Sequence, residues 1–306
     1  NGVSNSDGAS AGWSTAAVHL AASNGLEARY RRTAHRLGVT VLAGSGTQME
    51  RDREHRSASH RGDLPPPAEI GRTAGERTVR RLGPRKAATA AVPVVYDPRV
   101  ASSLVRHLVG AISGEAIAKG TSFLKDCLGD AIMSPGVVII DDPLRRRGLA
   151  SRPIDAEGLP VATRRLVDAG MLTTWLLDLS TARQLGLRST GHAARGTGGP
   201  PSPSATNLTL GPGRASPAEL IGDIRSGLYV TDLMGMGVNM LTGDYSRGAA
   251  GFWIEGGELK WPVSEVTIAG NLKDMLAVLQ PADDLDVTGS CDAPTVRIDG
   301  MTVAGR

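Results

Sequence analysis

The stretch that decides the fold is residues 227–275, GLYVTDLMGMGVNMLTGDYSRGAAGFWIEGGELKWPVSEVTIAGNLKDM. An apolar strand is predicted to begin at Leu228. Ala249–Glu255 predicts the next strand, and Leu259–Ile268 predicts its partner across the Gly256-Gly257 turn. Asn271 can cap a helix that begins directly after the last strand. The stretch therefore predicts a β-meander that ends in a short helix.

Strands also dominate the first third of the sequence. Asn24-Gly25 is typical of a hairpin turn, and Pro65-Pro66-Pro67 favours the first turn of a helix that would end at Gly83-Pro84. Acidic and basic residues alternate around Glu50–Glu54, as expected for a solvated strand face, so nucleic-acid binding is not favoured. The predicted strands are Ser10–Ser23, Arg29–Ala43 and Gln48–His60.

The rest of the chain alternates short strands with two helices. The small residues of Lys86–Ala91 mark a boundary, which predicts one domain over 1–86 and a β-rich domain over 87–306. Apolar residues four apart predict a helix over Val100–Lys119. Ser189–Ser204 is rich in Gly, Pro and Ser and predicts a long loop, a common place for function. The order of elements predicts an α+β fold with mostly antiparallel sheets and a few helices.

Composition limits the class of protein. Of 306 residues, 41% are hydrophobic but only 3% are aromatic, which predicts an aliphatic core. The sequence contains no run of 18 apolar residues that would predict a membrane-spanning helix. Two cysteines, Cys127 and Cys291, do not make a disulfide framework, and this favours a reducing cytoplasm.

Several long segments of the sequence resemble the TldD/TldE (PmbA) family, and specifically its TldE (PmbA) branch. They include GLYVTDLMGMGVN, TGDYSRGAAGFWIE and PVSEVTIAGNLKDM in the meander, and AIAKGTSFLKD, VVIIDDPL, RPIDAEGLP, GMLTTWLLD and GHAARG before it. The resemblance covers essentially the whole chain and implies a TldD/PmbA-like fold. In that family an α/β region precedes this point, so residues 1–86 are expected to be the C-terminal part of an N-terminal α+β region whose preceding segment is absent.

The TldD branch resembles zinc metallopeptidases that carry HExxxH on a helix, in which neighbouring turns place two imidazoles on one face. Counted back from Lys119-Gly120-Thr121-Ser122, the first histidine would fall at Val105, the glutamate at Arg106 and the second histidine at Gly110. None of these can bind zinc or accept a proton. His107 is out of register, and Cys291, in a stretch comparable to the cysteine ligand of the TldD branch, lacks partner histidines. We therefore expect no catalytic residue, no metal ligand and no cofactor on this chain.

The resemblance implies a cytoplasmic TldE/PmbA-like subunit of a TldD–TldE zinc metallopeptidase that degrades or processes unfolded peptides. Zinc is expected on the TldD-type partner, and this chain is expected to serve in assembly and in forming the substrate channel. An alternative from another class is a stand-alone homodimeric binding or regulatory protein, in line with the family's label as a modulator of DNA gyrase. A third interpretation is an independent hydrolase using Cys127 or Ser246.

Substrate could bind as an added β-strand, which uses main-chain hydrogen bonds and is therefore tolerant of sequence. Gly235, Gly237 and Gly248 would let a peptide backbone approach closely. The competing interpretation is that the residues between these strands only stabilise a turn, as Asp and Ser often do. The candidates for lining the channel are Asn239, Asp244, Tyr245, Ser246 and Arg247.

Overall fold

The computed structural model describes residues 2–196 and 198–305. Its first sheet consists of β1 (Val3–Ala21), β2 (Glu27–Ala43) and β3 (Glu50–Ala58), which pair antiparallel in chain order. Helix α1 (Pro67–Arg80) lies against β2 and β3 and begins at a proline, as predicted. Its buried residues Ile70, Ala74 and Thr78 are four apart and form one stripe.

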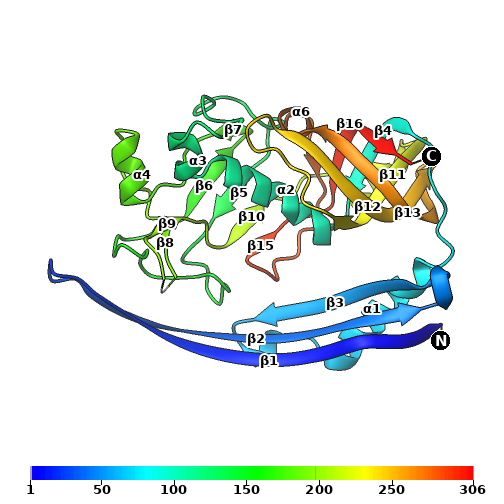
Figure 1. The fold of residues 1–306 in the computed structure, drawn as a ribbon, viewed down its shortest axis with the longest axis horizontal. Helices are drawn as coiled ribbons and strands as arrows, with labels where there is room; N and C mark the ends of the chain where they lie inside the picture. Colours follow the sequence, from blue (N-terminus) through cyan, green and yellow to red (C-terminus); the bar gives the residue numbers. More distant parts are fainter. Residues whose placement is uncertain (1, 197, 306) are drawn as a thin grey trace.

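The β1–β2 ribbon is the most exposed part of the protein. Figure 1 shows it continuing far past the end of β3, beneath the remainder of the chain. Residues of β1 are exposed along most of the strand, and the Trp13 residue is 74% exposed. At the hairpin end, a Cβ atom at Gly158 would lie 2.0 Å from Leu26 Cδ2, so the ribbon touches the larger part of the molecule there.

The meander forms part of a closed barrel. The strands follow the order β13-β12-β11-β4-β16, and β13 also pairs with β16 through Thr267–Ala269 and Thr302–Ala304. This last pairing closes the sheet, and closure leaves few free edges. The bounds are β4 (Ala90–Tyr96), β11 (Ser226–Met234), β12 (Asp244–Glu255), β13 (Glu258–Asn271) and β16 (Val296–Ala304), with β14 (Gln280–Pro281) added beside β16.

A second sheet stands beside the barrel, in the order β15-β10-β5-β6-β7. Its residues Ile139, Leu166 and Leu210 are fully buried and belong to the same core as the barrel interior. The bounds are β5 (Ile139–Asp141), β6 (Arg164–Asp168), β7 (Met171–Leu172), β10 (Leu208–Leu210) and β15 (Cys291–Asp292), with a separate pair of β8 (Ala193–Ala194) and β9 (Ser202–Pro203).

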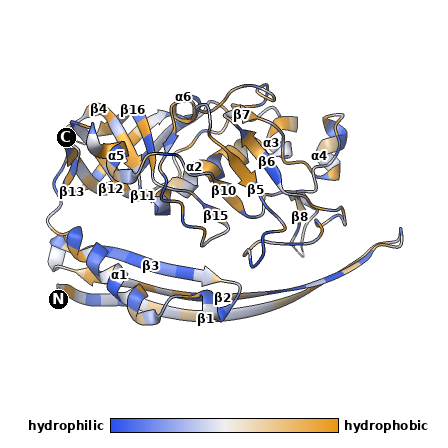
Figure 2. Cartoon of the chain, turned by 180° about the vertical axis from the view of Figure 1, so that it is seen from behind, coloured by the Kyte–Doolittle hydropathy of each residue, from blue (hydrophilic) through white to orange (hydrophobic). Residues whose placement is uncertain are grey.

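Helix α2 (Pro98–Ala111) joins the two sheets, because it contacts β4 and β11 of the barrel and β10 and β15 of the second sheet. Figure 2 shows the apolar residues concentrated in these sheets, while β1–β3 are mostly polar. Within the described residues no helix is long and apolar enough to cross a membrane. The remaining helices are α3 (Gly114–Ala118), α4 (Leu179–Gln184), α5 (Pro217–Gly222) and α6 (Leu272–Ala277), with short 3-10 turns at Gly46–Gln48 and Arg61–Asp63.

The predicted α+β fold with mostly antiparallel sheets is confirmed, but several element boundaries were wrong. Strand β1 begins at Val3 rather than at Ser10. The helix expected over 100–119 breaks at Ser113, because Gly114 N–H donates to Leu176 O at 2.8 Å instead of continuing the helix. A Cβ at Gly114 would lie 2.5 Å from Thr181 Oγ1, so the break is packed tightly against α4. Strand β12 begins at Asp244 rather than Ala249, which places the predicted turn residues 244–247 inside a strand.

Candidate functional site

The candidate site lies along α2, where the barrel meets the second sheet. Asp97 caps the helix by accepting a hydrogen bond from Arg99 N–H at 3.0 Å. Ala101, Leu104 and Leu108 turn one face of the helix into the shared core. The opposite face therefore remains available for function.

The three positions that the sequence resemblance aligns with HExxxH carry residues of different chemistry. Val105 is buried with 1% exposure, whereas Arg106 and Gly110 are exposed. A valine and a glycine offer no metal ligand, and a guanidinium is a cation that donates hydrogen bonds but accepts none. Among the described residues, no group of three or more His, Cys, Asp and Glu side chains could hold a metal ion.

Cys291 nevertheless lies against this helix. Its Sγ atom is 3.5 Å from Ser102 O, one turn before Arg106. Burial raises the pKa of the Cys291 thiol to about 11, although the nearby Arg106 charge acts in the opposite direction. The buried thiol therefore stays protonated near neutral pH.

A cleft of about 410 Å³ opens at the C-terminal end of α2. Val109 and Gly110 contribute its floor, α3 contributes a second side with the Glu115–Lys119 ion pair at 3.7 Å, and the end of the 189–204 loop faces them. The predicted loop is therefore part of a concave surface. The complete lining is Val109, Gly110, Ser113, Glu115, Ala116, Lys119, Thr121, Pro203, Ser204 and Ala205.

The β11–β12 connection covers the same end of the helix. Met240 Cε would lie 3.4 Å from a Cβ atom at Gly110, and Met240 O accepts a hydrogen bond from Phe123 N–H at 2.9 Å. Met236, with 91% exposure, projects from this connection, and Met234 and Leu241 are also exposed. Flexible methionine side chains adapt to differently shaped apolar partners.

The five predicted channel residues occupy three kinds of position. Asn239 Oδ1 accepts from Leu241 N–H at 3.0 Å, and Asp244 accepts from Thr242 Oγ1 and from Asn271 Nδ2, so both hold the turn together while remaining exposed. Ser246 is exposed, and Arg247 donates from Nε to Met234 O at 3.3 Å. Tyr245 is instead buried, with 1% exposure.

Tyr245 and His107 form a buried aromatic contact between β12 and α2. Their ring centroids are 6.0 Å apart and the rings meet edge to face. Burial, and secondarily the charge of Arg247, lowers the pKa of His107, while burial raises the pKa of Tyr245. Tyr245 Oη and His107 Nε2 are buried without a hydrogen-bond partner among the described residues. His107 is therefore part of the packing that supports the site.

The glycines expected to admit a peptide backbone are explained largely by contacts within the chain. A Cβ at Gly237 would lie 1.9 Å from Ser246 O, and one at Gly248 would lie 3.3 Å from Met234 Cβ. Gly235 has a φ of +77°, which favours glycine, and faces open space. A channel-lining role for the five residues stays a prediction, and it fits the exposed Asn239, Asp244 and Ser246 better than the buried Tyr245.

Sequence reasoning missed one buried polar network beside the site. His192 Nε2 lies 3.0 Å from Asp141 Oδ2, and His192 Nδ1 lies 2.8 Å from Thr190 Oγ1. Asp141 also accepts two hydrogen bonds from Thr206, from its N–H and its hydroxyl. The network connects the start of the 189–204 loop, which includes the GHAARG segment at residues 191–196, to β5. The clue in the sequence was a histidine inside an otherwise Gly- and Ser-rich loop.

Comparisons with known proteins agree with this architecture. Residues 89–305 match the PmbA/TldA metallopeptidase C-terminal domain, and residues 2–82 match the central domain of the same family. Metalloprotease PmbA of Escherichia coli O157:H7 is 40% identical over 285 residues, which cover 93% of this chain and 61% of that protein. A metalloprotease PmbA homolog of Haemophilus influenzae is 36% identical, over 99% of this chain and 66% of that protein.

Solved structures share the fold. A candidate modulator of DNA gyrase from Bacteroides thetaiotaomicron matches with a TM-score of 0.88 and 28% identity, over 97% of this chain and 66% of that one. TldE from Thermococcus kodakarensis matches with a TM-score of 0.87 at 23% identity, over 97% of this chain and 69% of that one, and supports the fold alone. The chain thus spans about three-fifths to two-thirds of the length of the curated relatives. It belongs to the PmbA/TldA metallopeptidase family.

Proposed function

We propose that this chain is a TldE-like, non-catalytic subunit of a two-subunit zinc metallopeptidase that acts on unfolded peptides in the cytoplasm. A TldD-type partner would supply the zinc and the general base. The present chain would complete the substrate chamber. The observation that carries the proposal is that α2 holds buried Val105, cationic Arg106 and Gly110 at the positions that we assign to the HExxxH motif.

The chemistry explains why these residues point to a partner. A zinc peptidase needs a metal to lower the pKa of bound water and a carboxylate to take its proton. Arg106 cannot take a proton, and its fixed positive charge would repel a divalent cation. The helix is nevertheless retained in place at the junction of two sheets, with a cleft of about 410 Å³ at its end. A cleft beside a helix whose aligned positions offer no zinc ligand fits a binding role.

The cleft and the β11–β12 connection provide the surfaces that an extended peptide needs. Polar groups at Ser113, Thr121 and Ser204 can accept or donate hydrogen bonds, and Met236 offers an adaptable apolar contact. The exposed Asn239 and Ser246 would extend this surface along the barrel. Recognition through main-chain hydrogen bonds would make the chamber tolerant of peptide sequence.

Hydrolysis of a labelled unfolded polypeptide tests the proposal. The full-length protein is assayed alone, and then mixed with a zinc-loaded TldD-type subunit, each with and without a chelator. We expect activity in the mixture alone and its loss on chelation. Chelator-sensitive activity from this chain by itself would contradict the proposal. A stable homodimer that never exchanges for the TldD-type subunit would favour the regulatory alternative.

A pair of variants tests the cleft itself. Ser204→Trp places a large side chain on the exposed lining of the cleft, whereas Ser226→Trp changes an exposed residue of β11 outside it. We expect Ser204→Trp to lower hydrolysis by the assembled complex by about tenfold, because small displacements of bound substrate are costly to the reaction. Ser226→Trp should leave the rate unchanged. Equal rates for the two variants, with the complex intact, would remove the cleft from the proposed chamber.

A further inference from the structure

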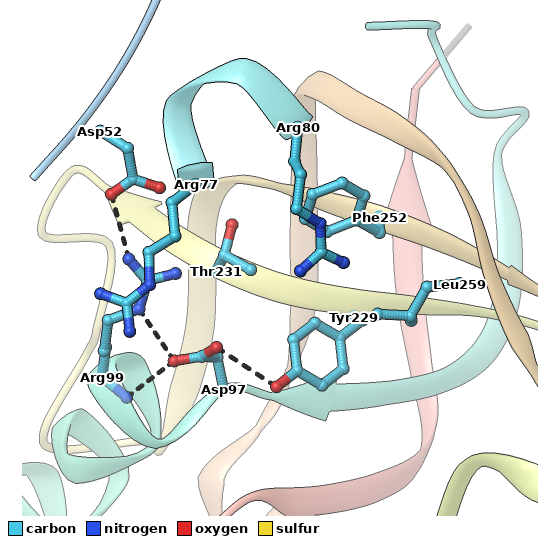
Figure 3. Close-up of a pocket in the computed structure, with 9 residues that line it drawn as sticks. All are labelled: Asp52, Arg77, Arg80, Asp97, Arg99, Tyr229, Thr231, Phe252 and Leu259. Carbon is cyan, nitrogen blue, oxygen red and sulfur yellow. Dashed lines mark hydrogen bonds and ion pairs between the residues drawn. The ribbon is translucent and has the colours of Figure 1, made fainter. Parts of the chain in front are cut away.

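A second cavity, of about 130 Å³, lies between the first sheet unit and the barrel. It is separate from the α2 cleft and shares no residue with its lining. Strand β3 and α1 form one wall, and β11, β12 and β13 form the other (Figure 3). The residues around it are Asp52, Arg77, Arg80, Asp97, Arg99, Tyr229, Thr231, Phe252 and Leu259.

The carboxylates of this cavity are already occupied by donors. Asp97 accepts from Arg99 Nε at 3.0 Å and from Tyr229 Oη at 3.2 Å. Asp52 accepts from Arg99 Nη1 at 3.0 Å and lies 3.8 Å from Arg81 Nη1. Paired carboxylates repel an incoming anion much less than free ones, because the neighbouring guanidinium charges offset their own.

Arg80 is different from the other two lining arginines. Arg99 is paired with Asp97 and Asp52, and Arg77 is paired with Glu54. Within the described part of the chain, Arg80 has no carboxylate within ion-pair distance and no hydrogen-bond acceptor. The lining thus holds three arginines against two aspartates, and the excess positive charge belongs to Arg80.

Phe252 holds the Arg80 guanidinium in place. The Arg80 Cζ atom lies 5.1 Å from the ring centroid, a distance typical of cation–π stacking. This contact uses no hydrogen-bond acceptor, and the Arg80 N–H groups therefore keep their donor capacity. Figure 3 shows Arg80 and Arg77 extending from α1 on either side of Thr231. A fork of free donors with a fixed plane is suited to an oxyanion with two acceptor oxygens.

We propose that this cavity is a binding site for one small oxyanion, a carboxylate or inorganic phosphate, held by Arg80 with help from Arg77 and the Thr231 hydroxyl. The cavity volume admits one such group. Because Arg80 and Arg77 belong to α1 while Thr231 and Phe252 belong to the barrel, the bound anion joins the two parts of the chain. The site would therefore couple anion binding to how firmly these parts are held together.

The experiment measures binding and thermal unfolding of the full-length protein with sodium acetate, sodium phosphate or sodium chloride at constant ionic strength. Acetate represents a carboxylate group and phosphate represents the free ion, so the arms distinguish the two sources. We expect at least one of them to bind and raise Tm, and chloride to have no such effect. Failure of both acetate and phosphate to bind would overturn the proposal.

Three variants locate the effect. Arg80→Gln should weaken anion binding and raise the Kd by about tenfold or more, since hydrogen bonds to charged groups are stronger than those between neutral groups. Arg80→Lys should weaken it less, because the charge remains but the planar fork is lost. Arg85→Gln is the matched control: Arg85 also stacks on an aromatic ring, with Cζ 5.8 Å from the Trp261 centroid, but lies outside the cavity.

Comparison of the Arg80 and Arg85 variants also distinguishes a specific binding site from nonspecific attraction of anions to a positively charged surface. If Arg80→Gln folds normally in anion-free buffer and binds as tightly as the unaltered protein, the assignment is wrong. The same holds if Arg85→Gln loses as much affinity as Arg80→Gln, because the effect would then reflect the overall positive charge of the surface. If Arg80→Gln is unstable, the smaller loss of affinity expected for Arg80→Lys is compared with the affinity of the Arg85→Gln control.

Discussion

His107 shows how a titratable residue of α2 takes a structural role. It follows Arg106 on α2, and its ring packs edge to face against Tyr245. Burial lowers the pKa of His107, with a further contribution from the charge of Arg247. The neutral imidazole is therefore the form that fits between the helix and β12.

This pKa shift predicts a pH dependence of stability. In the unfolded chain His107 takes up a proton near its ordinary pKa of 6.5, whereas the folded protein resists protonation until lower pH. Between these two pKa values the unfolded state binds more protons, so stability falls as pH falls from about 6.5 through the folded pKa. Above pH 6.5 the group adds no pH dependence.

Chemical denaturation at pH 7.5 and pH 5.5 measures the effect. We expect His107→Gln to lose less stability between these two values than the unaltered protein does. The unaltered protein, measured in the same buffers, is the reference for this comparison. An identical pH dependence for His107→Gln and the unaltered protein would contradict the assignment.

At the scale of elements, the β11–β12 connection depends on a close approach of two backbones. Gly237 O accepts from Ser246 N–H at 2.7 Å, and a Cβ at Gly237 would lie 1.9 Å from Ser246 O. No side-chain rotation can relieve that contact, because the backbone fixes the position of the Cβ atom and the atom it meets is a backbone oxygen. The connection therefore requires glycine at this position for steric reasons.

Substitution of two neighbouring glycines separates steric overlap from backbone strain. Gly237→Ala should lower the free energy of unfolding by about 2–3 kcal/mol, because the connection must move away from Ser246. Gly235→Ala should cost only about 1 kcal/mol, since its Cβ meets no atom within 4 Å and the cost comes from the φ of +77°. Denaturant titration gives both values. A larger loss for Gly235→Ala would contradict the steric account.

At the scale of the whole molecule, the first sheet unit and the larger part of the chain meet through charged contacts. Asp52 on β3 accepts from Arg99 on α2 at 3.0 Å, and the Asp52 residue is only 8% exposed. Arg147 and Asp63 form a second contact at 2.7 Å, with side chains that are 49% and 37% exposed. The two pairs offer a direct comparison of a buried and an exposed ion pair.

Removal of one charge from each pair tests which contact holds the two parts together. Asp52→Asn should lower the free energy of unfolding by about 1–3 kcal/mol, because a largely buried, charged acceptor is lost. Asp63→Asn should cost less than about 1 kcal/mol, as solvent screens exposed pairs. We expect limited proteolysis of the 82–89 connection to accelerate for Asp52→Asn alone. Equal acceleration for both variants would show that burial does not decide the strength of these contacts.

Local sequence patterns predicted many elements correctly, because helix caps and tight turns depend on residues that are close together in the chain. Asn271 caps α6, as predicted, by accepting a hydrogen bond from Lys273 N–H at 3.0 Å. Gly256 and Gly257, both with positive φ, turn β12 into β13 as expected.

The sequence by itself therefore determined the fold class and most of the local elements, because each depends on side-chain type and short-range spacing. Only the tertiary structure decided that β13 closes onto β16, that Tyr245 turns inward against His107, and that Arg80 stacks on Phe252. These contacts join residues that are far apart in the chain. Their pairing depends on strand register and on the mutual packing of whole elements, which periodicity within one segment does not encode.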